Sequence, residues 1–156
     1  MKIMLKKVLT GGVFNIVHPG HEFFLKKAKE FGDYLIVVVA SNRTAYTTKK
    51  YPVFDAKVRK ENLEKLDFVD KVVIGDDYDF MKIVQKEKPD FIVLGCDQKI
   101  NENKLKKMIL KAGLKCKIIR IKEKLKGYST SKIMETYIKN NRHPPGCGPI
   151  RPKNSH

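Results

Sequence analysis

The chain has 156 residues, of which 42% are hydrophobic, and it can bury a core of ordinary globular composition. Its 33 lysines and arginines exceed its 17 aspartates and glutamates, and the net charge of +16 favours anionic partners. A lysine-rich proteome or a hot habitat would give the same excess. Three cysteines without a CxxC pair argue against a disulfide framework or zinc knuckle and fit a reducing cytoplasm. No apolar run is long enough to span a bilayer, and the N-terminus MKIMLKKVL lacks a signal-peptide pattern.

Short apolar segments rich in β-branched residues predict five buried strands, and helical patterns lie between them. The predicted strands are 7–12, 34–40, 71–75, 91–95 and 115–121, the last of which suits an edge. The predicted helices are 21–31, 55–66, 79–88, 101–113 and 129–140. Asp55 is a predicted N-cap, Gly113 ends the fourth helix, and Ser129 or Thr130 caps the last. Segment 41–52, SNRTAYTTKKYP, predicts a long polar loop.

Strands that alternate with helices indicate an α/β fold with a doubly wound, five-stranded parallel sheet of Rossmann type. Ligands bind such sheets beyond the carboxyl ends of the strands, where the strand order reverses. We expect one domain at 1–140 and a tail at 141–156. That tail holds four of the seven prolines, so it predicts an irregular extension that can form neither a helix nor a central strand.

Two histidines, His18 and His21, lie where the first strand and a glycine-rich turn lead into a helix. Gly11 and Gly12 allow a tight turn, and Pro19 suits a helix entry because its missing N–H costs nothing there. The N-terminus of a helix binds phosphate, and residues three apart share a helical face, so both imidazoles can point at one phosphate. This pattern favours direct attack by one phosphate on the α-phosphate of a nucleoside triphosphate, with imidazole N–H groups stabilising the growing charge. A bare HxxH would more often be two ordinary histidines.

The run GGVFNIVHPGH at 11–21 resembles the G-x-F-D-x-x-H-x-G-H signature of the nucleotidylyltransferase superfamily. GYSTSKI at 127–133 resembles a second signature of that superfamily, an S-T-S/T-K-like run at the start of the last helix. The resemblance implies a nucleotidylyltransferase fold and a reaction with ATP. Triphosphate chemistry in turn predicts Mg²⁺ or another divalent cation, held mostly by phosphates and water. The sequence contains no acidic cluster with metal-ligand spacing, so we assign no protein ligand.

Within that superfamily the chain looks most like the small archaeal FAD synthases, which join FMN to AMP from ATP. The supporting stretches are YPVFDAKVR, FVDKVVIG and KPDFIVLGCDQ. The related glycerol-3-phosphate and ethanolamine-phosphate cytidylyltransferases usually carry Arg-Tyr before the VD of the third strand and G-D-D-W after the fourth. This chain has Asp67-Phe68 and GCDQ at 95–98 instead. FAD synthesis is therefore the leading hypothesis, a cytidylyltransferase that makes a CDP-alcohol is the second, and a non-catalytic nucleotide- or RNA-binding protein is the third.

The resemblance also implies site residues. The expected catalytic residues are His18, His21, Lys49 and Lys50. The expected nucleotide contacts are Gly12, Val13, Phe14, Asn15, His18, His21, Arg59, Asp97, Gln98, Lys124, Tyr128, Ser129, Thr130 and Ser131. Asn15 replaces the signature's usual Asp, and Val13 its frequent Thr or Ser.

Several of the expected site residues also have a structural alternative. Lys49 and Lys50 could lie in a solvated loop, Asp97 could be a turn residue, and 129–131 could serve only as a helix cap. Arg59 could hold the 41–52 loop or a phosphate, or pair with a surface carboxylate such as Glu61 or Glu64. The expected partners are the small molecules ATP and FMN, without nucleic acid or membrane, in the cytoplasm; whether two copies form a homodimer is left open.

Overall fold

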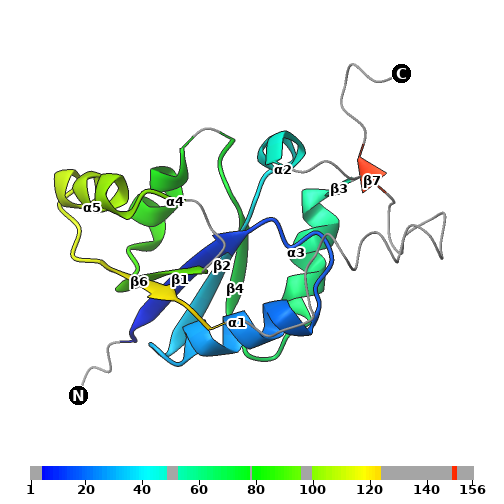
Figure 1. The fold of residues 1–156 in the computed structure, drawn as a ribbon, viewed down its shortest axis with the longest axis horizontal. Helices are drawn as coiled ribbons and strands as arrows, with labels where there is room; N and C mark the ends of the chain where they lie inside the picture. Colours follow the sequence, from blue (N-terminus) through cyan, green and yellow to red (C-terminus); the bar gives the residue numbers. More distant parts are fainter. Residues whose placement is uncertain (1–4, 49–52, 78, 96–99, 124–148, 151–156) are drawn as a thin grey trace.

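The computed structural model describes residues 5–48, 53–77, 79–95, 100–123 and 149–150. A five-stranded parallel sheet with the order β4-β2-β1-β5-β6 runs through the molecule (Figure 1). Its strands are β1 (Lys7–Gly12), β2 (Tyr34–Val39), β4 (Lys71–Ile74), β5 (Phe91–Gly95) and β6 (Lys117–Ile121). The five predicted strands, their parallel pairing and the edge position of β6 are confirmed.

Helices connect the strands, and a polar side chain caps the amino end of each one. The helices are α1 (Pro19–Lys29), α2 (Asn42–Thr48), α3 (Ala56–Glu64), α4 (Phe80–Glu87) and α5 (Glu102–Lys111). Asp55 is confirmed as the N-cap of α3, since its carboxylate accepts the Lys57 N–H at 2.9 Å. Gly113 follows α5 with φ 74°, and its N–H donates to the Leu110 carbonyl while that of Leu114 donates to Ile109. This pair of bonds is the glycine-dependent helix stop that the sequence predicted.

The second crossover differs from its prediction. Residues 42–48 form α2, whereas the polar composition of 41–52 predicted a loop. Ser41 starts this helix, because its hydroxyl oxygen accepts the Thr44 N–H at 3.2 Å and its carbonyl accepts the Ala45 N–H at 2.9 Å. The error arose because a seven-residue polar helix lacks the apolar periodicity that identifies longer helices.

Two further differences concern the ends of segments. Helix α1 begins at Pro19, two residues earlier than predicted, so His18 directly precedes the helix and His21 lies in its first turn. In the tail, β7 (Pro149–Ile150) pairs antiparallel with β3 (Val53–Phe54), so the prediction of an irregular tail is wrong at these two residues. Proline is tolerated there because the strand lies at the edge of a two-stranded sheet. The predicted helix 129–140 and the rest of the tail lie outside the described residues.

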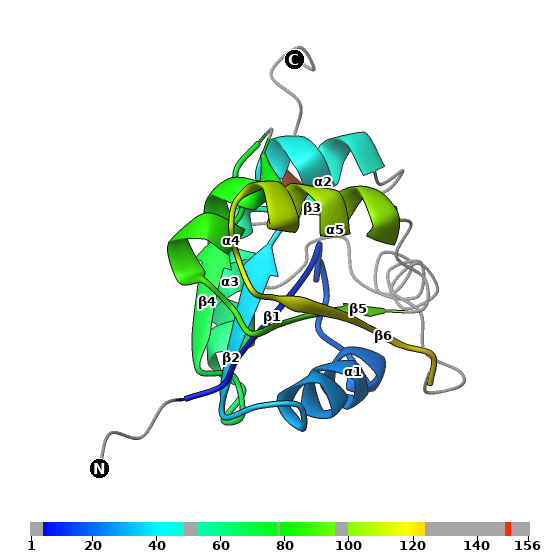
Figure 2. The ribbon, with the colours of Figure 1, turned by 90° about the vertical axis from the view of Figure 1, so that its left-hand side faces the viewer.

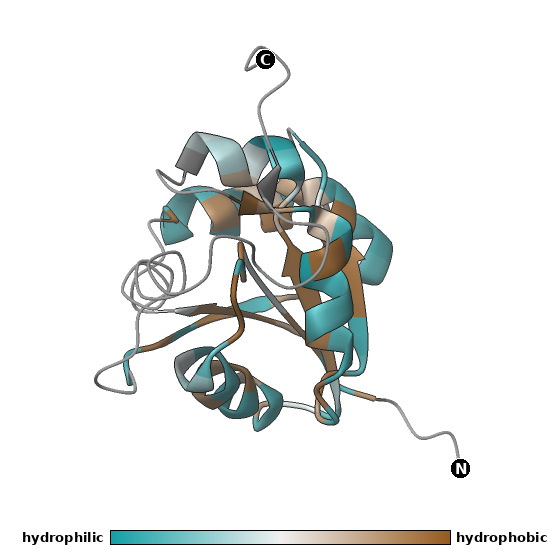
Figure 3. Ribbon diagram, turned by 90° about the vertical axis from the view of Figure 1, so that its right-hand side faces the viewer, coloured by the Kyte–Doolittle hydropathy of each residue, from teal (hydrophilic) through white to brown (hydrophobic). Residues whose placement is uncertain are grey.

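Alternate side chains of the central strands enter two separate hydrophobic cores. On one face Val8, Leu35 and Val93 pack with α1 and α3, and on the other Leu9, Ile36 and Ile92 pack with α4 and α5. Figure 2 shows α4 and α5 on one side of the sheet and α1 on the other. In Figure 3 most of the strands are brown, whereas the helices alternate between teal and brown. This two-sided burial is the reason that the strands are almost wholly apolar.

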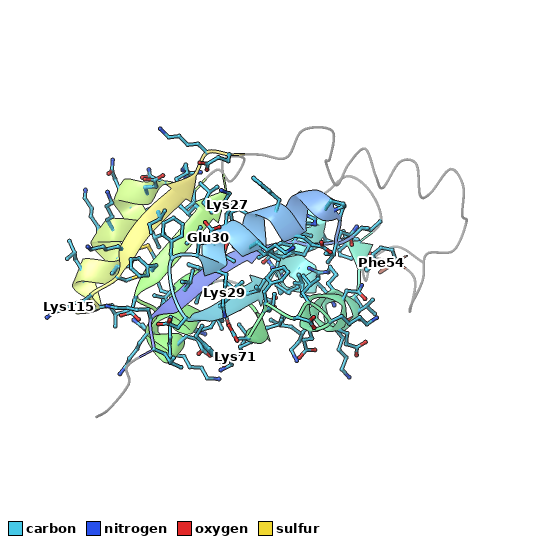
Figure 4. The ribbon with its side chains drawn as sticks, turned by 90° about the horizontal axis from the view of Figure 1, so that it is seen from below. Lys27, Lys29, Glu30, Phe54, Lys71 and Lys115 are labelled. Atoms are coloured by element: carbon cyan, nitrogen blue, oxygen red, sulfur yellow. The ribbon has the colours of Figure 1, made fainter. Side chains whose placement is uncertain are left out.

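Aspartates anchor the amino ends of the strands. Three aspartates each directly precede a strand, and each carboxylate accepts a backbone N–H from a neighbouring segment. Asp33 accepts from Lys6 (3.0 Å), Asp70 from Leu35 (2.7 Å) and Asp90 from Lys7 (2.8 Å). Ion pairs join Lys29 to Asp70 and Lys71 to Glu87, with both lysines labelled in Figure 4. The amino edge of the sheet is therefore occupied by structural contacts.

The order of the strands places the reversal point at the end of β1. From β1 the chain continues to β2 and β4 on one side, and then crosses to β5 and β6 on the other. The reversal lies between the carboxyl ends of β1 and β5, at Gly12 and Gly95. None of the helices that the structure describes has the length and hydropathy that a membrane-spanning helix requires.

We expect Leu105→Ala to lower the free energy of unfolding by about 2–5 kcal/mol, because Leu105 is buried between α5 and the sheet. Leu110→Ala is the matched control in the same helix, since Leu110 is 75% exposed and should change stability little. Urea denaturation followed by circular dichroism measures both. Equal losses in the two variants would contradict the described packing of α5.

Candidate active site

The turn from β1 to α1 has an unusual backbone conformation. Phe14 has φ 50°, in the left-handed region that a bulky residue rarely adopts, and its ring is buried. A Cβ on Gly12 would lie 2.9 Å from the Phe14 ring, so glycine is required where the ring packs over the strand end. The same ring meets that of His21 edge-on, with centroids 5.1 Å apart. Such conformations persist only where the surroundings hold them, and they occur often at functional sites.

The two histidines are brought together by a capping arrangement. His18 is the N-cap of α1, and its Nδ1 accepts the Gly20 N–H at 3.0 Å. His21 is the third helical residue, and its Nδ1 accepts the His18 N–H over a long 3.4 Å. The rings stack with centroids 3.8 Å apart and an angle of 24° between their planes. The sequence predicted that the two rings lie close together on one face of a helix. The rings do lie close together, but only His21 is inside the helix, and His18 is the residue before it.

These bonds determine which ring nitrogen carries the proton. Because Nδ1 of both rings accepts a backbone N–H, each neutral ring carries its hydrogen on Nε2. His18 is only 8% exposed, and burial lowers its pKa from the usual 6.5, so His18 is neutral near pH 7. A neutral imidazole with an Nε2–H is a hydrogen-bond donor suited to a phosphate oxygen, and this arrangement gives His18 no need to act as a nucleophile.

A buried polar network lies behind the turn. Asn15 is 1% exposed, and its Oδ1 accepts the Phe54 N–H at 2.7 Å. Arg59 has no exposed area and donates from Nε to the Phe54 carbonyl (2.8 Å) and from one terminal nitrogen to the Val13 carbonyl (2.9 Å). The other terminal nitrogen donates to Asn42 Oδ1 at 3.3 Å. Phe54 lies toward the end of the molecule away from Lys115 (Figure 4).

The surface-pairing alternative for Arg59 is wrong. Its guanidinium donates to two backbone carbonyls and an amide oxygen, while Glu64 pairs with Lys60 at 3.6 Å. Burial lowers the pKa of Arg59 to about 10, and the nearby charge of Asp55 opposes that shift. Arg59 therefore stays positively charged near neutral pH.

Sequence reasoning missed Arg120 at the other strand end. Its Nε donates to Glu102 Oε1 at 2.5 Å, and its terminal nitrogens donate to the carbonyls of Gly95 (2.7 Å) and Ile100 (3.2 Å). The guanidinium thus joins the end of β5 to the start of α5. The sequence feature that could have identified Arg120 is its place in the apolar run KIIRI, near the carboxyl end of a predicted strand.

The structure locates only part of the predicted site. The turn and the helix start carry six of the predicted residues, with Arg59 behind them. The six are Gly12, Val13, Phe14, Asn15, His18 and His21. The remaining predicted residues lie outside the described residues: Lys49, Lys50, Asp97, Gln98, Lys124, Tyr128, Ser129, Thr130 and Ser131.

Two other kinds of site receive no support from the described residues. In that part of the chain, no group of three or more His, Cys, Asp or Glu residues could hold a metal ion. Burial raises the pKa of the Cys116 thiol to about 11, so this cysteine is not a thiolate near neutral pH. Cys96 and Cys147 lie outside the described residues.

Known proteins resemble this chain in sequence and in fold. The profile of a family described as cytidylyltransferase-like matches residues 9–136. The FAD synthase of Ferroglobus placidus is 40% identical over 136 residues, which cover 86% of this chain and 89% of that protein. The FAD synthase of Methanothermus fervidus is 44% identical, covering 81% and 91% respectively. A crystal structure of a lipopolysaccharide core biosynthesis protein from Thermoplasma volcanium superposes with a TM-score of 0.74 at 42% identity, covering 77% of this chain and 98% of that one.

We expect ¹⁵N NMR to show His18 neutral and protonated on Nε2 near pH 7, with a pKa below 6.5, because its Nδ1 is an acceptor and the ring is buried. The folded protein then binds this proton less readily than the unfolded chain. The free energy of unfolding should therefore fall as the pH drops below 6.5. His18→Asn keeps a capping side chain without a titrating ring, so it should lack this part of the decrease. An Nδ1-protonated ring, or a pKa at or above 6.5, would contradict the assignment.

Proposed function

Because this chain belongs to the cytidylyltransferase-like family, we propose that it is an FAD synthase, which transfers AMP from ATP to FMN and releases pyrophosphate. The observation that carries this conclusion is the extent of the similarity to two FAD synthases, at 40% and 44% identity over most of each protein. The stacked pair of histidines at the end of β1 supplies chemistry that suits nucleotidyl transfer.

In the proposed reaction, a phosphate oxygen of FMN attacks the α-phosphorus of ATP. A new P–O bond forms, the bond from the α-phosphorus to the bridging oxygen breaks, and pyrophosphate leaves with that oxygen. The Nε2–H groups of His18 and His21 donate hydrogen bonds to phosphate oxygens on which charge grows. The neutral state of His18 suits this role, because a neutral imidazole donates from Nε2 without a proton transfer from the ring.

The turn and the helix start supply the rest of the phosphate site in this proposal. The N-terminus of α1 presents backbone N–H groups and a partial positive charge to an anion. Lys49, Lys50 and residues 129–131 remain proposed contacts of the triphosphate, and Asp97 and Gln98 remain proposed contacts of the nucleoside. The proposed divalent cation, which neutralises phosphate charge, would be held mainly by phosphates and water, and we assign it no ligand from the chain.

The comparisons also bear on the other two hypotheses. The family name keeps a cytidylyltransferase as the second candidate, whereas the named relatives favour FMN and ATP as substrates. The similarity to two FAD synthases favours an enzyme over a purely binding role. The proposed partners are therefore the small molecules ATP and FMN, and the cytoplasm remains the expected compartment.

Nucleotide and acceptor choice can be tested directly. We expect the purified protein with Mg²⁺ to release pyrophosphate from ATP only when FMN is present, with FAD detected as the product. The matched incubations replace ATP with CTP, and FMN with glycerol-3-phosphate. Release with CTP and glycerol-3-phosphate alone would establish the cytidylyltransferase alternative and overturn FAD synthesis.

The role of the histidines needs variants that preserve the helix cap. His18→Asn keeps an oxygen that can accept the Gly20 N–H but removes the Nε2 donor, and His21→Gln removes the second ring. We expect each variant to lower kcat by roughly 10²–10³-fold, as for the loss of one transition-state hydrogen bond, with little change in ATP affinity. Lys106→Gln, at an exposed position of α5, is the control and should retain full turnover. Normal kcat in both histidine variants would exclude the proposed role.

A further inference from the structure

Arg59 is the largest fully buried side chain in the described part of the chain, and it carries a charge. The resemblance to nucleotidylyltransferases suggested it as a nucleotide contact. We propose instead that Arg59 is a positioning residue, which holds the phosphate-binding turn and helix α2 in fixed relation and does not touch the nucleotide. This inference rests on the proposed function of the turn.

The first argument is accessibility. Arg59 has no exposed surface, so a ligand that arrives from solvent cannot contact the guanidinium without a rearrangement of the residues around it. Its three nitrogens already donate to acceptors in three different segments: Val13 in the turn, Phe54 in β3 and Asn42 in α2. A planar fork that reaches three fixed acceptors is a property of arginine that lysine cannot reproduce.

The second argument concerns the orientation of the turn. The bond from Arg59 to the Val13 carbonyl directs that oxygen into the protein. Because the peptide unit is planar and trans, the N–H of Phe14 must point the opposite way, away from Arg59. Phe14 is also the residue with φ 50°, a conformation that costs on the order of 1–3 kcal/mol unless its surroundings stabilise it. Arg59 thus restrains the peptide that precedes the strained residue.

The third argument is that the same network holds two neighbouring segments. Both backbone groups of Phe54 are engaged by the site, since its N–H donates to Asn15 and its carbonyl accepts from Arg59. Asn42 Oδ1 accepts both from Arg59 and from the Ala56 N–H at 2.7 Å. Helix α2 ends at Thr48, immediately before the proposed triphosphate lysines 49 and 50. One buried guanidinium therefore couples the turn to the helix that leads to those lysines.

Two substitutions separate the charge of Arg59 from its shape. Arg59→Lys keeps the charge but cannot reach three acceptors, whereas Arg59→Gln loses both the charge and the fork. A positioning role predicts that kcat falls in both variants to a similar degree, by roughly 10²-fold, because small displacements of a catalytic turn have effects of that size. A nucleotide ligand would instead leave Arg59→Lys close to the wild type and make Arg59→Gln lose ATP affinity. Lys60→Gln is the control on the same helix, since Lys60 is partly exposed and pairs with the surface residue Glu64.

A second measurement distinguishes positioning from a general loss of stability. We expect ¹H–¹⁵N NMR spectra of Arg59→Lys to show shifted amide signals at residues 13–15 and 42, with unchanged signals in α5. Asn42→Ala serves as a substitute if the Arg59 variants fail to fold, because it removes one acceptor and keeps the buried cation. It should shift the same turn signals and also lower kcat. The spectra do not depend on activity, so they test the inference even if the wild type makes no FAD. The inference would be overturned if Arg59→Lys left the turn signals unchanged, or if it kept the wild-type kcat. Where Arg59→Lys does not fold, unchanged turn signals in Asn42→Ala would overturn it.

Discussion

Strand β1 lies between β2 and β5, and its hydrogen bonds to them are the constraint on which the rest of the structure depends. Its residues pair with β2 from Lys7 to Gly12, and Val8 and Leu9 pair with β5 on the other side. The reversal of strand order at β1 leaves the carboxyl end of this strand without a crossover helix directly above it. The turn that carries the histidines begins at that end, so the register of buried apolar strands determines where the polar site lies.

The amino and carboxyl edges of the sheet are used differently. At the amino edge, aspartates and lysines satisfy one another and the adjacent backbone N–H groups. At the carboxyl edge, two arginines hold backbone carbonyls, Arg59 beside β1 and Arg120 beside β5. Arginine suits this task because its guanidinium donates in several fixed directions and keeps its charge when buried.

Much of the fold was predictable, because it depends on local patterns. Apolar β-branched runs identified the five strands, and residues such as Asp55 and Gly113 identified helix ends through bonds to their immediate neighbours. Helix α2 escaped prediction because its stability comes from a serine cap and packing, not from apolar periodicity. The pairing of Pro149 and Ile150 with β3 was also missed, because it joins segments about a hundred residues apart in the sequence.

The sequence by itself determined the chemical content of the site: two histidines at a strand-to-helix turn, with glycines before them, in a pattern that resembles nucleotidylyltransferases. Only the tertiary structure decided that both rings accept backbone N–H groups at Nδ1, which selects Nε2 as the donor. It also decided that Arg59 is buried against Val13, from a position 46 residues away, and is not paired on the surface. The physical reason is that composition and spacing specify which groups are available, whereas burial and hydrogen-bond direction depend on contacts between distant segments.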